Sequence, residues 1–165
     1  MKLPPSYDVA IRAGQNALDR VTAPGSEGTD VEIAVGTFLF WIVALDDRIR
    51  DLNKAEHADA VMTQSASSVM PGLHLARNAL AHGVVPVSLP GGITVAFTIP
   101  FVIHPLRWAT LSQLTDGWTP QKSKHLLRQI LVFEEQLAER ETVPTLQSAL
   151  DWVASFAPER RSQFE

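Results

Sequence analysis

The strongest constraint on the fold of this chain is its longest uncharged segment, residues 33–45, which reads IAVGTFLFWIVAL. Its second part, Phe38–Leu45, is apolar on every side of a helix, so a single buried stripe cannot cover it. Two explanations stay open. Either the segment is the central helix of the domain, or one face meets the core and another meets a second subunit. The run is shorter than the roughly 17 to 25 residues of a membrane span, so we expect no membrane helix.

Composition narrows the class of protein. The chain has 165 residues, 45% of them hydrophobic and 19% charged, which predicts one globular domain over residues 1–165. A net charge of -4 argues against coating nucleic acid by bulk charge, and the lack of Cys excludes a disulfide scaffold. Pro4, Pro5 and Asp8 interrupt the region where a signal peptide would be apolar, so we expect a cytoplasmic protein.

Apolar periodicity predicts a mainly α fold, a bundle of about five helices. Asp30 is expected to cap the long apolar helix, Pro71 to lie in the first turn of a short one, and Gly83 to end that short helix in a left-handed conformation. The expected helical segments are 6–21, 30–52, a more polar 54–68, 72–82, 121–140 and 144–156.

A change of pattern follows the short helix. The segments 84–88 and 93–98 are rich in β-branched residues and flank Leu89–Gly92, a turn sequence; a third extended piece covers 101–104. Four prolines, at 86, 90, 100 and 105, favour a short hairpin over a large sheet. We therefore predict a β-hairpin inserted at about residues 84–104.

Several kinds of site are absent from the sequence. No Gly-rich phosphate loop opens a helix and no G-x-S-x-G motif is present. His74 and His82 are about 12 Å apart along one helix, too far to share a metal ion, so we expect neither a metal nor a cofactor. The charged group Asp46, Asp47, Arg48 and Arg50 is interpreted as a solvated helix end.

The segment Arg77-Asn78-Ala-Leu-Ala-His82-Gly83 has the composition of an acid–base site. Asn78 and His82 are four residues apart and share a helix face, and the long Arg77 side chain can reach the same place. Arginine supplies a fixed cation, histidine titrates near neutrality, and asparagine can orient either group. Together these residues can bind a phosphate and transfer a proton.

This motif resembles the R-x4-6-H signature of HEPN domains, with the polar residue that those proteins place after the arginine. The resemblance covers residues 6–83 and the C-terminal helices, and makes the hairpin an insertion. Arg50 and His57 also fit the spacing, but a helix break at Asn53–Lys54 argues against that pair.

The resemblance implies a homodimer in which two motifs form one composite site, and a metal-independent endoribonuclease with RNA as its substrate. It makes Arg77, Asn78 and His82 the catalytic residues. Many such proteins are toxins or abortive-infection effectors, some with an antitoxin protein as partner. The alternative is a non-catalytic HEPN-like module that binds a nucleotide or a protein. His74, one turn before Asn78, is either a supporting partner of the site or, as we favour, a helix-surface residue.

Overall fold

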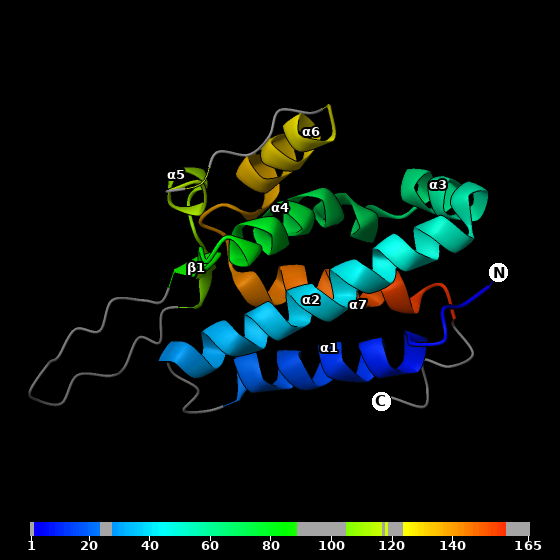
Figure 1. Ribbon diagram of the computed structural model, residues 1–165, viewed down its shortest axis with the longest axis horizontal. Helices are drawn as coiled ribbons and strands as arrows, with labels where there is room; N and C mark the ends of the chain where they lie inside the picture. The colour runs from blue at the N-terminus through cyan, green and yellow to red at the C-terminus, as the bar shows by residue number, and fades with distance from the viewer. Residues whose placement is uncertain (1, 24–27, 89–104, 117, 119–123, 158–165) are drawn as a thin grey trace, which may run out of the picture.

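The computed structural model describes residues 2–23, 28–88, 105–116, 118 and 124–157. Within these residues the mainly α fold is confirmed (Figure 1). The α-helices are α1 (Tyr7–Thr22), α2 (Gly28–Leu52), α3 (Lys54–Thr63), α4 (Met70–Ala81), α5 (Leu111–Leu114), α6 (Lys124–Val132) and α7 (Thr142–Ala154). A 3₁₀ helix, η1 (Ser65–Val69), and a π-helix, η2 (Phe133–Leu137), follow α3 and α6.

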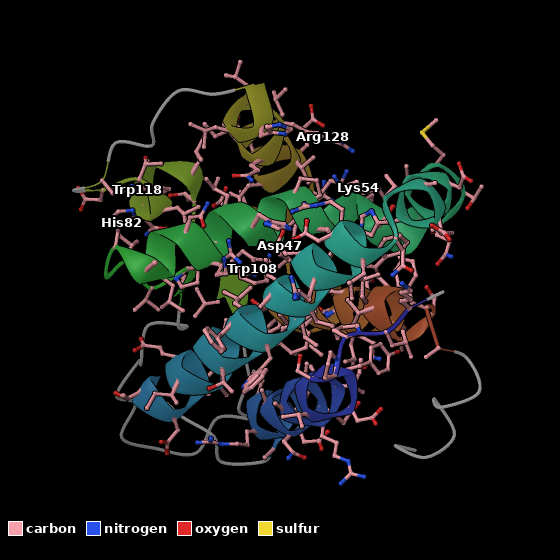
Figure 2. All side chains as sticks on the ribbon, turned by 45° about the vertical axis from the view of Figure 1, so that its right-hand side comes forward. Asp47, Lys54, His82, Trp108, Trp118 and Arg128 are labelled. Atoms are coloured by element: carbon pink, nitrogen blue, oxygen red, sulfur yellow. The ribbon has the colours of Figure 1, made fainter. Side chains whose placement is uncertain are left out.

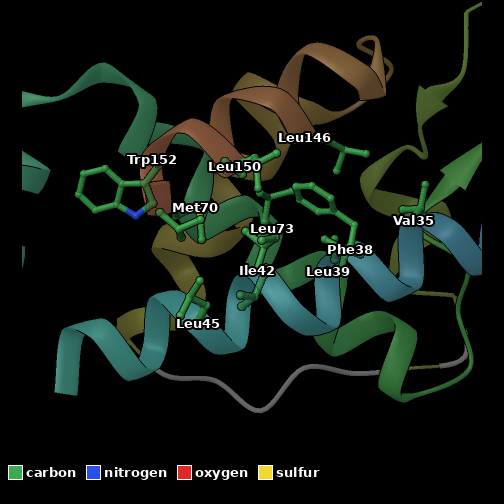
Figure 3. Close-up of a cluster of buried hydrophobic side chains, with 14 of the residues drawn as sticks. Val35, Phe38, Leu39, Ile42, Leu45, Met70, Leu73, Leu146, Leu150 and Trp152 are labelled. Carbon is green, nitrogen blue, oxygen red and sulfur yellow. The ribbon is translucent and has the colours of Figure 1, made fainter. Parts of the chain in front are cut away.

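The apolar helix α2 is the centre of the bundle. It packs against α1, α4 and α7, and its buried side chains interleave with those of α4 and α7 (Figure 3). Phe38, Leu39 and Ile42 are completely buried. The burial of such side chains is the main favourable contribution to folding, about 1.5 to 3 kcal/mol for each.

An apolar strip of α2 nevertheless stays exposed. Phe40 is 59% exposed and Ile33 50%, and Trp41, which packs edge-on to Phe40, is half-buried. The explanation as a core helix is therefore confirmed for one side of α2, and contact of the other side with a second subunit stays a prediction. One side of α2 is core, and another side faces outward with side chains that a core would accept.

By length and composition α2 is also the one helix in the described part of the chain that could cross a membrane. The buried helix of a bundle satisfies the same two measures.

Helix α4 lies close to η2 because of a glycine. A Cβ atom on Gly72 would lie 3.0 Å from a methyl carbon of Leu137 and 3.2 Å from the Cα of Phe133. A Cβ atom there would fit only if these neighbours moved by a few tenths of an ångström. Gly72 thus allows α4, the helix that carries the Arg77 motif, to pack closely against η2.

The β structure differs from the prediction. Val87–Ser88 (β1) pairs antiparallel with Arg107–Trp108 (β2), with Val87 opposite Trp108, so the partner strand lies beyond the predicted end at residue 104. The predicted strand 93–98, the turn 89–92 and the extended piece 101–104 lie outside the described residues. Val87 and Trp108, which lie opposite each other in this register, are both buried.

Several helix boundaries also differ. The predicted helix 54–68 is broken at Gln64 into α3 and η1, and α5, which is held by a Thr110–Gln113 capping box, was not predicted. The helical segment predicted to end at residue 140 ends with η2. Its successors, Glu139 and Arg140, exchange backbone hydrogen bonds with Trp108, and those bonds replace the helical ones. The residues predicted to open that helix, 119–123, lie outside the described part.

Candidate functional site

The candidate site is built at the C-terminal end of α4. Leu73, Ala76 and Ala79 of this helix are completely buried, which leaves Arg77 and Asn78 on its half-buried side. Pro71 lies in the first turn, as predicted. The apolar positions of α4 are buried in the core, and the helix therefore places the motif on its solvent-facing side.

His82 follows the last residue of the helix, and its backbone position is fixed. Gly83 is left-handed, with φ of 81°, as predicted. Its N–H donates to the carbonyl of Leu80, and the N–H of Val84 donates to that of Ala79, both at 3.0 Å. These two bonds are the Schellman ending of a helix. The left-handed glycine after His82 thus fixes the backbone from which the imidazole side chain projects.

Arg77 is held by a carboxylate from α2. Its Nη1 donates to Oδ2 of Asp47 at 3.1 Å, and its Nη2 lies 3.4 Å from Oδ1 of Asn78. Asp47 is shared, because its Oδ1 also accepts from Nη2 of Arg50 at 2.6 Å. The Arg77 side chain is 32% exposed, so the guanidinium is anchored on one side and open to solvent on another.

His82 is exposed and stacks on Trp118. The centroids of the two rings are 4.9 Å apart and their planes differ by 20°. Figure 2 shows the pair beyond the end of α4, with Asp47 farther along on α2. Among the described residues, no hydrogen-bond partner is found for either nitrogen of the His82 ring.

Asp46, the neighbour of Asp47, is buried, so the interpretation of the charged group as a solvated helix end is wrong for this residue, whereas Arg48 and Arg50 are exposed as expected. Asp46 is 3% exposed. Its Oδ1 accepts from Nε1 of Trp152 at 2.7 Å and lies 2.9 Å from Nε2 of His57; its Oδ2 lies 3.5 Å from Nε2 of His74. One carboxylate thus joins α2, α3, α4 and α7.

The charge of Asp46 is stabilised by these contacts. Burial raises the pKa of the carboxyl, but the hydrogen bonds from His57, His74 and Trp152 and the charge of His57 outweigh burial. The pKa is held well below its usual value of 3.8. Asp46 is therefore an anion at neutral pH.

His74 is not a helix-surface residue. Its side chain is only 12% exposed and its Nε2 lies between the two carboxylates of α2, 3.5 Å from Asp46 and 3.8 Å from Asp47. Asp47 also accepts a hydrogen bond from Arg77, so this carboxylate links His74 to Arg77. This position makes His74 a bridge between the buried carboxylate and the exposed motif.

The second sequence match, Arg50 with His57, is separated as expected. The helix break falls at Asn53, between α2 and α3. His57 is buried against Phe156, and the centroids of their parallel rings are 5.7 Å apart. Arg50 is exposed and forms an ion pair with Asp47. The structure does not bring these two residues together.

Sequence reasoning missed Asp46, Asp47 and Trp118. A signal for Asp46 was present: it continues the helical spacing of Leu39, Ile42 and Ile49, so a carboxylate occupies a position of the buried stripe. Trp118, beyond the hairpin, has no sequence relation to His82 and could be found only from the tertiary structure.

Within the described residues, no group of three or more His, Asp or Glu side chains is arranged to hold a metal ion. The arrangement offers instead an anchored guanidinium, an amide and an exposed imidazole. Such groups can contact an oxyanion and exchange a proton.

Comparisons of this chain with protein-family models, with curated proteins and with solved structures give no match.

Proposed function

We propose that this chain is a metal-independent endoribonuclease of the HEPN type, which acts in the cytoplasm as a homodimer. The observation that supports this most is the state of His82: an exposed imidazole, with no hydrogen-bond partner among the described residues, at the end of the helix that carries Arg77 and Asn78. His57, in contrast, is buried and lies 2.9 Å from Oδ1 of Asp46.

In this proposal His82 takes the proton of the ribose 2′-hydroxyl or gives one to the leaving 5′-oxygen. The 2′-oxygen forms a bond to phosphorus while the bond from phosphorus to the 5′-oxygen breaks. The products are a 2′,3′-cyclic phosphate and a 5′-hydroxyl. Arg77 stabilises the charge that grows on the phosphate oxygens, and Asn78 orients the guanidinium or the phosphate.

The nucleophile provides the test of this chemistry. We expect a single 2′-deoxy substitution at the cleaved nucleotide to block cleavage there, because the attacking oxygen is missing. Activity should survive EDTA and should fall as salt rises, since phosphate contacts are screened. Labelled RNA and its deoxy-substituted counterpart, incubated with purified protein, give the measurement. Equal cleavage of both substrates would mean that water is the nucleophile and would end the proposal.

The homodimer is supported by the exposed strip of α2. Phe40, Ile33 and the half-buried Trp41 lie on the helix that supplies Asp47 to Arg77. A two-fold contact along α2 would cover these apolar side chains and bring two Arg77–His82 sets to one groove.

We therefore expect light scattering to give twice the mass of one chain at micromolar concentration. Phe40→Glu should shift the protein to monomer, because a charge would be buried in the contact. Met62→Glu is the matched control, since Met62 of α3 is 86% exposed and lies off the strip. A wild-type monomer, or equal dissociation by both variants, would contradict this assembly.

A binding module without catalysis is the second candidate, favoured by the partner of Arg77. Asp47 offsets the positive charge that an RNA backbone requires, and the whole chain carries a net charge of -4. Binding of RNA or a nucleotide with no cleavage product would favour this function. An antitoxin protein belongs to the first proposal only, as the partner that would restrain a toxic nuclease.

A further inference from the structure

Trp118 is placed against His82 by the fold. It follows α5, which is anchored by the completely buried Leu114 and by the capping box of Thr110 and Gln113. The N–H of Trp118 donates to the carbonyl of Thr115 at 3.2 Å, which closes a turn directly after the helix. The indole is half-buried and lies nearly parallel to the imidazole, 4.9 Å from it. This is a favourable stacking distance.

The stack on Trp118 limits the rotation of the His82 ring. The helix ending fixes the backbone of His82, but not the rotation of its side chain. Within the described part of the chain no hydrogen bond orients the ring, so the indole is the group found against it. It covers one face of the imidazole and leaves the edge, where the nitrogens lie, uncovered. Indole has no group that titrates near neutrality, so Trp118 does not itself exchange the proton.

We propose that Trp118 is a positioning residue, which holds the imidazole of His82 at the angle needed for proton transfer; this rests on the proposed ribonuclease function. Trp118 acts through the flat face of its ring. A phenyl ring can replace that face, whereas a branched aliphatic side chain of moderate size cannot.

Two variants of Trp118 separate orientation from packing. Trp118→Leu keeps an apolar side chain and should lower kcat for RNA cleavage by about 10- to 100-fold with little change in KM, because a freely rotating base is seldom aligned. Trp118→Phe should recover most of the rate. Both are assayed well below their thermal midpoints, beside the wild type and His82→Ala.

An NMR measurement reports the stack without reference to activity. In the wild type the imidazole protons of His82, assigned by their loss in His82→Ala, should be shifted upfield by the indole ring. The shift should largely disappear in Trp118→Leu and persist in part in Trp118→Phe.

The outcomes distinguish the two proposals. If wild type and His82→Ala cleave RNA equally poorly, the proposed function is wrong and the role of Trp118 is lost with it. If the wild type cleaves and Trp118→Leu is equally fast, the positioning role alone is wrong. A slow Trp118→Phe, or unshifted His82 protons in the wild type, would also overturn it.

Discussion

Alanine in place of His82 is expected to slow RNA cleavage by about 10²- to 10⁴-fold, the usual contribution of a positioned general acid or base. Arg77→Ala should cost a comparable factor, about 10²- to 10³-fold, because charge on the phosphate would lose its stabilising cation. Asn78→Ala should reduce the rate less, since the amide lies 3.4 Å from the guanidinium and only orients it. Initial rates with a labelled RNA measure all three.

The fold should survive these changes. His82 is exposed, and the ion pair of Arg77 with Asp47 is partly open to solvent, where such pairs contribute about 1 kcal/mol or less. Thermal midpoints are therefore expected within about 4 °C of the wild type.

Matched controls come from α6. His125→Ala and Arg128→Ala remove the same side chains from exposed positions on another helix, and should leave cleavage unchanged. Figure 2 shows Arg128 on a different part of the surface from His82. If His82→Ala instead melts the protein while the folded fraction cleaves normally, the histidine is structural.

Asp46→Ala is expected to cause the largest loss of stability. The change leaves the Trp152 indole N–H and the ring nitrogens of His57 and His74 without their shared acceptor in the interior. Removing one partner of a buried ionic network costs about 3 to 5 kcal/mol. For a chain of this size the thermal midpoint should fall by roughly 10 °C or more, as measured by calorimetry.

Asp47→Ala is the matched control for stability. This neighbouring carboxylate is 29% exposed and pairs with Arg50 and Arg77 near the surface. Its removal should cost about 1 kcal/mol or less. Equal destabilisation by the two variants would show that burial of Asp46 does not have the importance given to it here.

The pKa of Asp46 predicts how its contribution depends on pH. Because the pKa in the folded state lies below the usual value of 3.8, the contribution of the charge is fully present above about pH 4. It is lost as the pH falls from there toward the lowered pKa. The difference in unfolding free energy between wild type and Asp46→Asn should therefore shrink as the pH falls below about 4. A difference that grows on acidification would contradict the assignment.

Much of the helical framework follows from local sequence. Apolar spacing places α1, α2 and α7 within about two residues of their observed ends, since a helix face must repeat at the helical period to be buried. Pro71 and Gly83 likewise place α4, because each has a backbone preference that holds in any context. The motif Arg77, Asn78 and His82 could be placed on a helix end for the same reason.

Pairing between distant segments could not be derived in this way. The strand partner of Val87 is Trp108, and both side chains are buried in this pairing. The end of η2 depends on the same strand, whose backbone groups compete with the helix for Glu139 and Arg140. Local periodicity contains no information about that competition.

The helical class, the apolar centre of the bundle and the residues of the motif can be recognised in the sequence, because each depends on spacing along one segment. The contact of Asp47 with Arg77 and the contact of Trp118 with His82 follow from the tertiary structure alone. These contacts join segments far apart in the chain. Their geometry is set by how the helices pack against one another, and packing is a property of the whole core.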